Sequence, residues 1–305
     1  MRLKVTISPL TPFGSPLLGE TLFGQLCWAL RRLESEAALS QALEGYLENK
    51  PFMVVSDAVP SGFFPLPTLP SRFWEDKENF DLKDLKSRQW IALTNTTAPV
   101  EKWQSLGVHP KDIPSFDSQR RVEVHNTINR QTISTATGQF APYMKEQVWY
   151  GADCLLDLYF VIDERLTPES LITLLSHVGE SGFGRDASTG LGKFKFMSVE
   201  ELSTQENSQC VMALASCALE APALDPQKCF YRIKTHFGRH GDLLAVGKNP
   251  FKKPILLAQS GAVLSFVKPQ TLSFVGRGIG GISTIHPQTV HQGYAPVIHL
   301  PTIRQ

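Results

Sequence analysis

The feature that most constrains this chain is a glycine-rich stretch between a predicted helix and a predicted strand. Residues 181–194 read SGFGRDASTGLGKF, in which two Gly-apolar-Gly triplets are separated by five residues. Thr167 and Pro168 begin the preceding helix as its cap and its first-turn proline, and leucines then recur at helical spacing. After Lys193, charged and apolar residues alternate as in a strand. The sequence therefore predicts a helix, a tight glycine loop and a strand, in that order.

This order excludes the dinucleotide-binding fingerprint that residues 182–187 otherwise match. The fingerprint requires a strand before its glycines and a helix after them. A second match, at Gly276, Gly278 and Gly281, has too few residues after it for a helix, a strand and an acidic ribose ligand. We therefore expect no cofactor, and we interpret the second glycine stretch as a loop that cradles phosphates with the help of Arg277.

Composition and charge indicate a globular protein whose partner sites are local. The hydrophobic content is 42%, and 30 Lys and Arg against 29 Asp and Glu give a formal net charge of +1, so any RNA site must be a local basic patch. No apolar run approaches the roughly 18 residues that span a bilayer, and the start carries no signal-peptide pattern. The five cysteines are scattered, which predicts reduced thiols, no metal site and a cytoplasmic protein.

The first 33 residues predict a strand followed by an amphipathic helix. Leu3, Val5 and Ile7 alternate with polar residues, and an apolar stripe runs through residues 20–33. A strand, a short loop and an amphipathic helix are the opening elements of a ferredoxin-like βαββαβ unit. Residues 51–116 are rich in proline and aromatic side chains, which indicates an insertion in the first domain rather than a linker.

Hydrogen-bond donors without bulky apolar neighbours gather at residues 119–132. They are Arg120, Arg121, His125, Asn126, Asn129 and Arg130. Such side chains suit phosphates and base edges of single-stranded RNA, and an exposed polar hairpin is the alternative interpretation of the same residues.

The most basic window lies at residues 231–253, where six Lys and Arg accompany one acidic residue. Phe237, Phe251 and several glycines are interleaved with these cations, which indicates a loop that faces RNA or a partner protein, with an ordinary solvated surface as the alternative. His236 and His240 have the spacing of a metal pair, but Gly238 between them argues against the required helix.

Six short motifs occur along the chain in an order that resembles a known family. They are TPFGSP with TLFGxLCWA (11–29), HNxINR with TxTG (125–138), the paired glycine triplets (182–192), FKKP (251–254), GxGxGG (276–281) and HQGYAP (291–296). The glycine pattern resembles the RAMP superfamily of CRISPR proteins. The set as a whole resembles the fourth-subunit family of type III-A (Csm) CRISPR effector complexes.

This resemblance implies an α+β fold with two tandem ferredoxin-like (RRM-like) domains, of which the second is degenerate. The N-terminal domain would span residues 1–200, with an insertion at about 50–116 and a β-hairpin thumb at about 117–147. The C-terminal domain would span residues 205–305, and glycine-rich loops would complete the fold.

The resemblance also implies a function in antiviral defence. The chain would be a non-catalytic RNA-binding subunit that holds the 5′ handle of the crRNA, with no membrane association. It would bridge the large polymerase-cyclase subunit to the first backbone RAMP subunit. The RNA-binding candidates are His125, Asn126, Asn129, Arg130, Arg239, Lys253, Gly276, Arg277, Gly278, Gly280, Gly281, His291 and Gln292, and the glycine-loop candidates are Gly182, Gly184, Arg185, Ser188, Gly190 and Gly192.

The alternative function is that of an endoribonuclease, because a related branch of the superfamily cleaves CRISPR repeat RNA. Acid–base cleavage of RNA needs a positioned side chain such as histidine near the scissile phosphate, and His125, His236 and His240 are candidates. None of them has a recognisable spacing to a catalytic partner. We therefore expect no enzymatic activity.

Overall fold

An antiparallel sheet forms around the first strand, and its burial follows the alternation in the sequence. The computed structural model describes residues 1–75, 81–114, 116, 118–135, 137–203, 207–247 and 249–301. Leu3, Val5 and Ile7 of the first strand are buried, as predicted. The sheet has the order β2-β8-β1-β9, and a further short strand, β3, also pairs with β8. Its members are β1 (Arg2–Pro9), β2 (Met53–Val55), β3 (Val59–Pro60), β8 (Leu156–Ile162) and β9 (Phe194–Glu201).

Two amphipathic helices cover this first sheet. The helix α1 (Gly19–Leu33) follows β1, and α5 (Pro168–Ser181) follows β8. Thr167 caps α5 through its side chain, which accepts a hydrogen bond from the Ser170 N–H, as predicted. The helices pack on each other and on the sheet, with α1 against β2 and α5 against β9. A short helix, α2 (Glu36–Ala42), follows α1.

A second antiparallel sheet forms from the C-terminal part of the chain, in the order β13-β10-β15-β14. Its long strand β15 also lies against α1 and β2 of the first half. The Gln292 side-chain amide there accepts from the Val55 N–H (2.9 Å) and donates to the Val55 carbonyl (2.8 Å). The strands are β10 (Ser208–Ala213), β13 (Val263–Gln270), β14 (Phe274–Ile279) and β15 (His291–His299).

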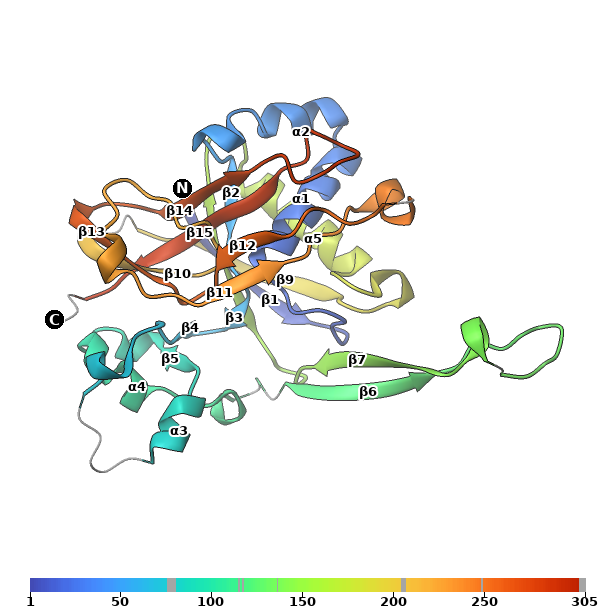
Figure 1. Ribbon diagram of the computed structural model, residues 1–305, viewed down its shortest axis with the longest axis horizontal. Helices are drawn as coiled ribbons and strands as arrows, with labels where there is room; N and C mark the ends of the chain where they lie inside the picture. The colour runs from blue at the N-terminus through green and yellow to red at the C-terminus, as the bar shows by residue number, and fades with distance from the viewer. Residues whose placement is uncertain are drawn as a thin grey trace.

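Three two-stranded ribbons complete the fold (Figure 1). One belongs to a small subdomain with two short helices, and another, the thumb, extends far from the body. The elements are β4 (Phe63–Pro65) with β5 (Trp90–Ala92), β6 (Gln119–His125) with β7 (Tyr143–Trp149), β11 (Ile233–His236) with β12 (Ile255–Ala258), and the helices α3 (Leu82–Ser87) and α4 (Trp103–Leu106).

The fold is thus a mixed α/β arrangement with several antiparallel sheets, in agreement with the predicted α+β class. The strands β2 and β3 lie inside the predicted insertion of residues 50–116, yet both pair with β8 in the first sheet. The predicted start of the second domain, Gln205, lies outside the described residues. All five cysteines are free, as predicted. None of the helices in the described part of the chain is long and apolar enough to cross a membrane.

Candidate nucleic-acid interface

The thumb is a regular hairpin that is fixed to the body at its base. The strands β6 and β7 pair from Gln119 opposite Trp149 to His125 opposite Tyr143. At the base, Phe13 and Val148 exchange two backbone hydrogen bonds of 2.9 Å, and the buried Phe13 ring packs on Phe183. The predicted hairpin is therefore present, and buried aromatic packing holds its root.

The two faces of the thumb differ in chemistry. One face carries Arg121, Glu123 and His125, opposite Gln147, Lys145 and Tyr143 of β7. The other face carries Val122 and Val124, with Met144 opposite Val124, and all three side chains are exposed. The sequence suggested a cluster of donors without apolar neighbours. The structure separates a polar face from a mixed face, on which Arg120 and Glu146 form an exposed ion pair beside the apolar side chains, because side chains alternate along each strand.

The four candidate residues of the thumb have different surroundings. The His125 ring is stacked on Tyr143, with the ring centroids 5.6 Å apart. Asn129 builds the tip, because its side chain accepts a hydrogen bond from the Gln131 N–H (2.9 Å) and its backbone pairs with Ser134. Asn126 and Arg130 are exposed beside this turn and offer donors to solvent.

The glycine loop connects α5 to β9, as predicted, and all four of its glycines have positive φ. At Gly192 a Cβ would lie 2.1 Å from the Phe183 carbonyl oxygen, and at Gly182 it would lie 2.4 Å from the Leu191 carbonyl oxygen. These two glycines let the two sides of the loop approach within van der Waals distance. At Gly190 nothing lies within 4 Å, and the nearby Ser188 is exposed. The loop is tight at its neck and open at its tip.

Two contacts join the glycine loop to the thumb. The Lys145 Nζ of β7 forms an ion pair with Asp186 Oδ1 at 2.8 Å, and both side chains are mostly buried. Arg185 donates to the Glu146 carbonyl at 2.5 Å, and its backbone N–H donates to Ser15 Oγ. The structure thus brings two predicted site segments together. Lys145 and Asp186 were not predicted, since nothing in their local sequence distinguishes them from other surface charges.

The C-terminal glycine stretch differs from the predicted phosphate loop. Gly276, Arg277 and Gly278 lie within β14 and pair with β15, so they do not form a loop. A Cβ on Gly278 would lie 2.4 Å from the Tyr46 carbonyl oxygen, so the glycine permits close packing of β14 on the first half of the chain. Arg277 is exposed and forms an ion pair with Glu220 at 2.9 Å. The prediction of a loop at 276–278 was wrong, because these residues form an edge strand that pairs with β15, and their contact with phosphate stays a prediction.

The loop begins only after Ile279 and contains Gly280 and Gly281. The Gly281 carbonyl accepts from the Lys253 Nζ (3.1 Å), and the Lys253 N–H donates to the Ile282 carbonyl (2.7 Å). Arg239 is exposed, lies over the Phe251 ring and donates to the Ala245 carbonyl. These candidates form a second surface group, apart from the thumb tip.

His291 and Gln292 lie in the protein interior. Both are buried in β15, and the Gln292 side-chain amide forms two hydrogen bonds with the Val55 backbone. Burial, with smaller effects from the charges of His236 and Lys252, lowers the pKa of His291 to about 3, so its imidazole is neutral at pH 7. The prediction that these two residues contact RNA is corrected, because their side chains support the packing of the two sheets.

A buried ionic cluster, which the sequence did not predict, lies where the basic window meets α1. Lys234 Nζ lies 2.5 Å from Glu20 Oε1, and His236 Nδ1 lies 3.4 Å from the same oxygen. The Glu20 side chain has no exposed surface. His240 contacts Ser283 Oγ at 3.0 Å rather than His236. Within the described residues no group of three or more His, Cys, Asp or Glu is arranged to hold a metal ion.

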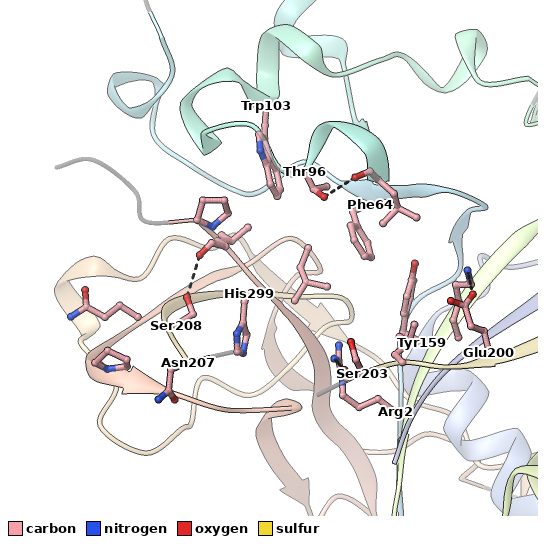
Figure 2. A pocket seen from close by; sticks show the side chains of 18 residues that line it. Arg2, Phe64, Thr96, Trp103, Tyr159, Glu200, Ser203, Asn207, Ser208 and His299 are labelled. Atoms are coloured by element: carbon pink, nitrogen blue, oxygen red, sulfur yellow. Dashed lines mark hydrogen bonds and ion pairs between the residues drawn. The ribbon is translucent and has the colours of Figure 1, made fainter. Parts of the chain in front are cut away.

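A cavity of about 850 Å³ lies between the subdomain and the two sheets (Figure 2). Its volume is within the range of small-molecule sites. Its charged groups are occupied within the protein, because Lys4 pairs with Glu200 and Arg2 donates to the Ser203 and Val297 carbonyls. None of the predicted site residues is among the described residues that line it. The cavity is therefore separate from the candidate interface.

Similarity of this chain to known proteins is found among solved structures. No protein-family model matches the sequence, and no curated protein matches it either. Solved structures match over nearly the whole chain. A Csm1–Csm4 cassette in complex with pppApA matches with a TM-score of 0.60 and 15% identity over 98% of both chains. A Csm1–Csm4 cassette with cA4 matches with a TM-score of 0.61 and 14% identity, over 99% of this chain and 100% of that one. The Csm3–Csm4 subcomplex of the type III-A CRISPR-Cas interference complex matches with a TM-score of 0.60 and 13% identity, over 99% of this chain and 100% of that one.

Csm4 is the component that these assemblies share. The chain has the Csm4 fold. The structural likeness is thus to the same family that the sequence motifs resemble. Because the identities are 13–15%, the likeness concerns the fold, and the activity needs its own argument.

Proposed function

We propose that this chain is the Csm4-like RAMP subunit of a type III-A CRISPR effector complex. In that complex it holds the crRNA 5′ handle without cleaving it. It contacts a Csm1-like large polymerase-cyclase subunit and a Csm3-like first backbone subunit, and it acts in the cytoplasm in antiviral defence. The observation that carries the proposal is the full-length fold likeness to a component found both with Csm1 and with Csm3.

Two tandem ferredoxin-like domains form part of the proposal, with their boundary near residues 200–205. The first is supported by the chain order β1, α1, β2, β8, α5, β9 and by the lateral order β2-β8-β1-β9. For the second, the sheet β13-β10-β15-β14 supports a degenerate version, because the helical elements described after residue 207 are short 3-10 turns.

The thumb and the glycine loop are the proposed guide-binding surface. The ion pair between Lys145 and Asp186 fixes the thumb relative to the loop, so a backbone lying along the polar face would meet both. Arg130 at the tip and the stacked His125 offer a cation and a ring to single-stranded RNA. No cofactor or metal is part of this proposal.

The salt dependence of RNA binding tests the proposed surface. For single strands, log affinity falls with log salt by about 0.7 for each phosphate contact, so a fourfold rise in salt weakens binding about 2.6-fold per contact. We expect Arg130→Ala to weaken binding of a labelled handle RNA and to reduce this slope by about 0.7. The matched control is Lys83→Ala, which removes an exposed cation from α3 on the subdomain. Equal slopes for native chain and Arg130→Ala would remove Arg130 from the site.

The same RNA tests the alternative function. The handle and a full repeat are incubated with and without divalent metal, cross-linked and separated on a denaturing gel. A retarded, uncleaved band that only handle sequence competes away agrees with a guide-holding subunit. Discrete shorter products that disappear in His125→Ala would make the chain an endoribonuclease.

A further inference from the structure

The loop between β11 and β12 has two arms that are paired with each other next to the ribbon. Arg239 on the first arm and Phe251 on the second form an antiparallel bridge. Beside this bridge, the Lys252 N–H donates a hydrogen bond to the Gly238 carbonyl at 2.8 Å. The side chains at this end of the loop are therefore presented on a paired backbone and keep defined positions relative to one another.

The same loop is attached to the body of the protein. His240 is buried beside Ser283, with its Nε2 3.0 Å from the Ser283 Oγ. On the other arm, the Lys253 N–H donates to the Ile282 carbonyl (2.7 Å), and the Lys253 Nζ donates to the Gly281 carbonyl (3.1 Å). Both arms are thus anchored to the segment that follows β14, so the exposed side chains between them are preorganised for binding.

Aromatic rings on this part of the chain are exposed to solvent. Phe237 is 72% exposed and Phe251 is 62% exposed, although phenylalanine is among the residues most often buried. Tyr231, just before β11, is 40% exposed. The Arg239 guanidinium lies over the Phe251 ring, 6.0 Å from its centroid. The protein core does not use these rings, and a group of exposed apolar side chains marks an interaction site.

Aliphatic side chains extend this exposed surface along the ribbon. Ile233 of β11 and Leu256 of β12 are exposed, and Thr235 lies directly opposite Leu256 in the register. Leu257, the next residue of β12, is buried opposite Lys234, so the ribbon has one side toward the body and one side toward solvent. We call the solvent-exposed surface the ribbon face, and it consists of Tyr231, Ile233, Phe237, Arg239, Phe251 and Leu256.

The charge around the ribbon face is positive. Arg232, Arg239 and Lys253 are exposed, and Asp242 is the one acidic residue in the sequence from 231 to 258. Because the formal net charge of the whole chain is only +1, an RNA site must be a local basic patch, and this segment is such a patch.

Rings and cations together define the kind of partner. Sites for single-stranded nucleic acid combine positive charge, which follows the phosphate backbone, with aromatic side chains on which the bases stack. Unpaired RNA therefore offers flat bases to the three rings and phosphates to the three cations. The aliphatic pair, Ile233 and Leu256, contributes apolar contact without stacking. A protein partner is the other candidate, and the experiment below separates the two.

We propose that the ribbon face binds unpaired RNA by stacking, as a second RNA surface in addition to the thumb. This rests on the proposed function and extends it, since only the thumb and the glycine loop were assigned to the guide above. The ribbon face is built on β11, β12 and their loop, whereas the thumb is built on β6 and β7, a separate ribbon of the fold (Figure 1). An RNA that contacts both surfaces crosses the body of the chain, and its nucleotides at the ribbon face are single-stranded.

Binding of labelled handle RNA to the purified full-length chain, followed by fluorescence anisotropy, tests this mode of contact. The double variant Phe237→Leu with Phe251→Leu keeps apolar side chains but removes both rings. We expect it to bind RNA at least about fivefold more weakly, because each ring that stacks on a base contributes about fivefold or more to affinity. The salt dependence should stay unchanged, because no charge is removed. Phe237→Tyr with Phe251→Tyr keeps the rings and should bind like the native chain.

Two further variants and a second probe separate stacking from charge. Leu82→Ala truncates an exposed apolar side chain on α3, outside the ribbon face, and should leave RNA binding unchanged. Arg239→Ala removes a cation, so it should weaken binding and also reduce the slope of log affinity against log salt by about 0.7. A duplex of the same sequence offers no unpaired bases, so the native chain and the leucine double variant should bind it equally.

The possible outcomes are distinct. Unchanged RNA affinity in the leucine double variant, with handle RNA still bound by the native chain, would overturn this proposal and leave the proposed function intact. Equal losses in the leucine and tyrosine variants would also overturn it, because the rings would not be the cause. If the leucine double variant kept its RNA affinity but lost binding of the large subunit or the backbone subunit, the ribbon face would be a protein-docking surface instead. If the native chain bound no handle RNA at all, the proposed function would fail together with this inference.

Discussion

Glu20→Gln is the change that tests the buried ionic cluster most directly. The carboxylate lies fully buried in the first turn of α1, with Lys234 Nζ at 2.5 Å and His236 Nδ1 at 3.4 Å. Burial raises the pKa of Glu20, but the hydrogen bond from His236 and the charge of Lys234 lower it by more, so the group is ionised. Glutamine has nearly the same shape and no charge. The substitution therefore removes the counter-ion and leaves the lysine in place.

The expected loss of stability follows from the burial of the pair. Removing one partner of a buried ion pair costs about 3–5 kcal/mol. Because the Lys234 side chain retains 23% of its exposure, water can solvate part of the charge, and we expect a value near the lower end, about 3 kcal/mol. Unfolding entropy of about 2.1 cal/mol/K per residue over about 300 residues gives ~0.6 kcal/mol/K, so Tm should fall by about 5 °C.

Thermal unfolding followed by circular dichroism measures this shift, with Glu36→Gln as the matched control. Glu36 pairs with Arg31 at 2.9 Å, but its side chain is 69% exposed, and exposed pairs contribute about 0–1 kcal/mol. The double variant Glu20→Gln with Lys234→Met should be more stable than Glu20→Gln alone, because it removes the orphaned charge. Equal Tm shifts for the two glutamine variants, or a double variant whose losses simply add, would refute the reasoning.

Two further predictions concern pH and backbone geometry. Burial, and then the charge of Glu20, raises the pKa of the Asp57 carboxyl to about 7, so its contribution to stability is complete below about pH 4 and is lost as the pH rises through 7. Between about pH 5 and pH 8 the Tm of the native chain should therefore fall relative to that of Asp57→Asn, and parallel curves would contradict this. Gly192→Ala should lower the urea midpoint more than Gly190→Ala, because both positions have positive φ but only at 192 would the new Cβ meet the Phe183 carbonyl, at 2.1 Å. Equal midpoints would show that the loop relaxes around the added methyl group.

Features set by local sequence were predicted well. The cap at Thr167, the glycine loop and the first strand each depend on residues that are neighbours along the chain. A hairpin is present where the thumb was expected, with its strands paired from Gln119 to Trp149. In these segments the local backbone requires a particular residue type, such as glycine at a positive φ or threonine at a helix cap. The residue type therefore indicates the local structure directly.

Features set by distant partners were missed. Gly278 was interpreted as part of a loop, but it is a strand residue that must admit the Tyr46 carbonyl. Residues 255–258 and 263–270 are close neighbours in the sequence, yet β12 pairs with β11 and β13 pairs with β10. Gln292 was predicted to contact RNA. Its side chain is instead hydrogen-bonded to the backbone of Val55, which is more than two hundred residues away in the sequence. Sequence pattern alone cannot supply these partners.

The buried ionic cluster also bears on the register of the ribbon formed by β11 and β12. A one-residue slip of β11 alone would turn Ile233, which is 66% exposed, toward the body and would turn Lys234 and His236 outward, which the hydrophobic effect alone would favour. Glu20 opposes that slip, because an unpaired carboxylate buried in α1 would lose both of its partners. A buried ion pair adds little net stability compared with an apolar core, but it can select one register among several. The cluster thus favours the register in which Lys234 lies opposite the buried Leu257.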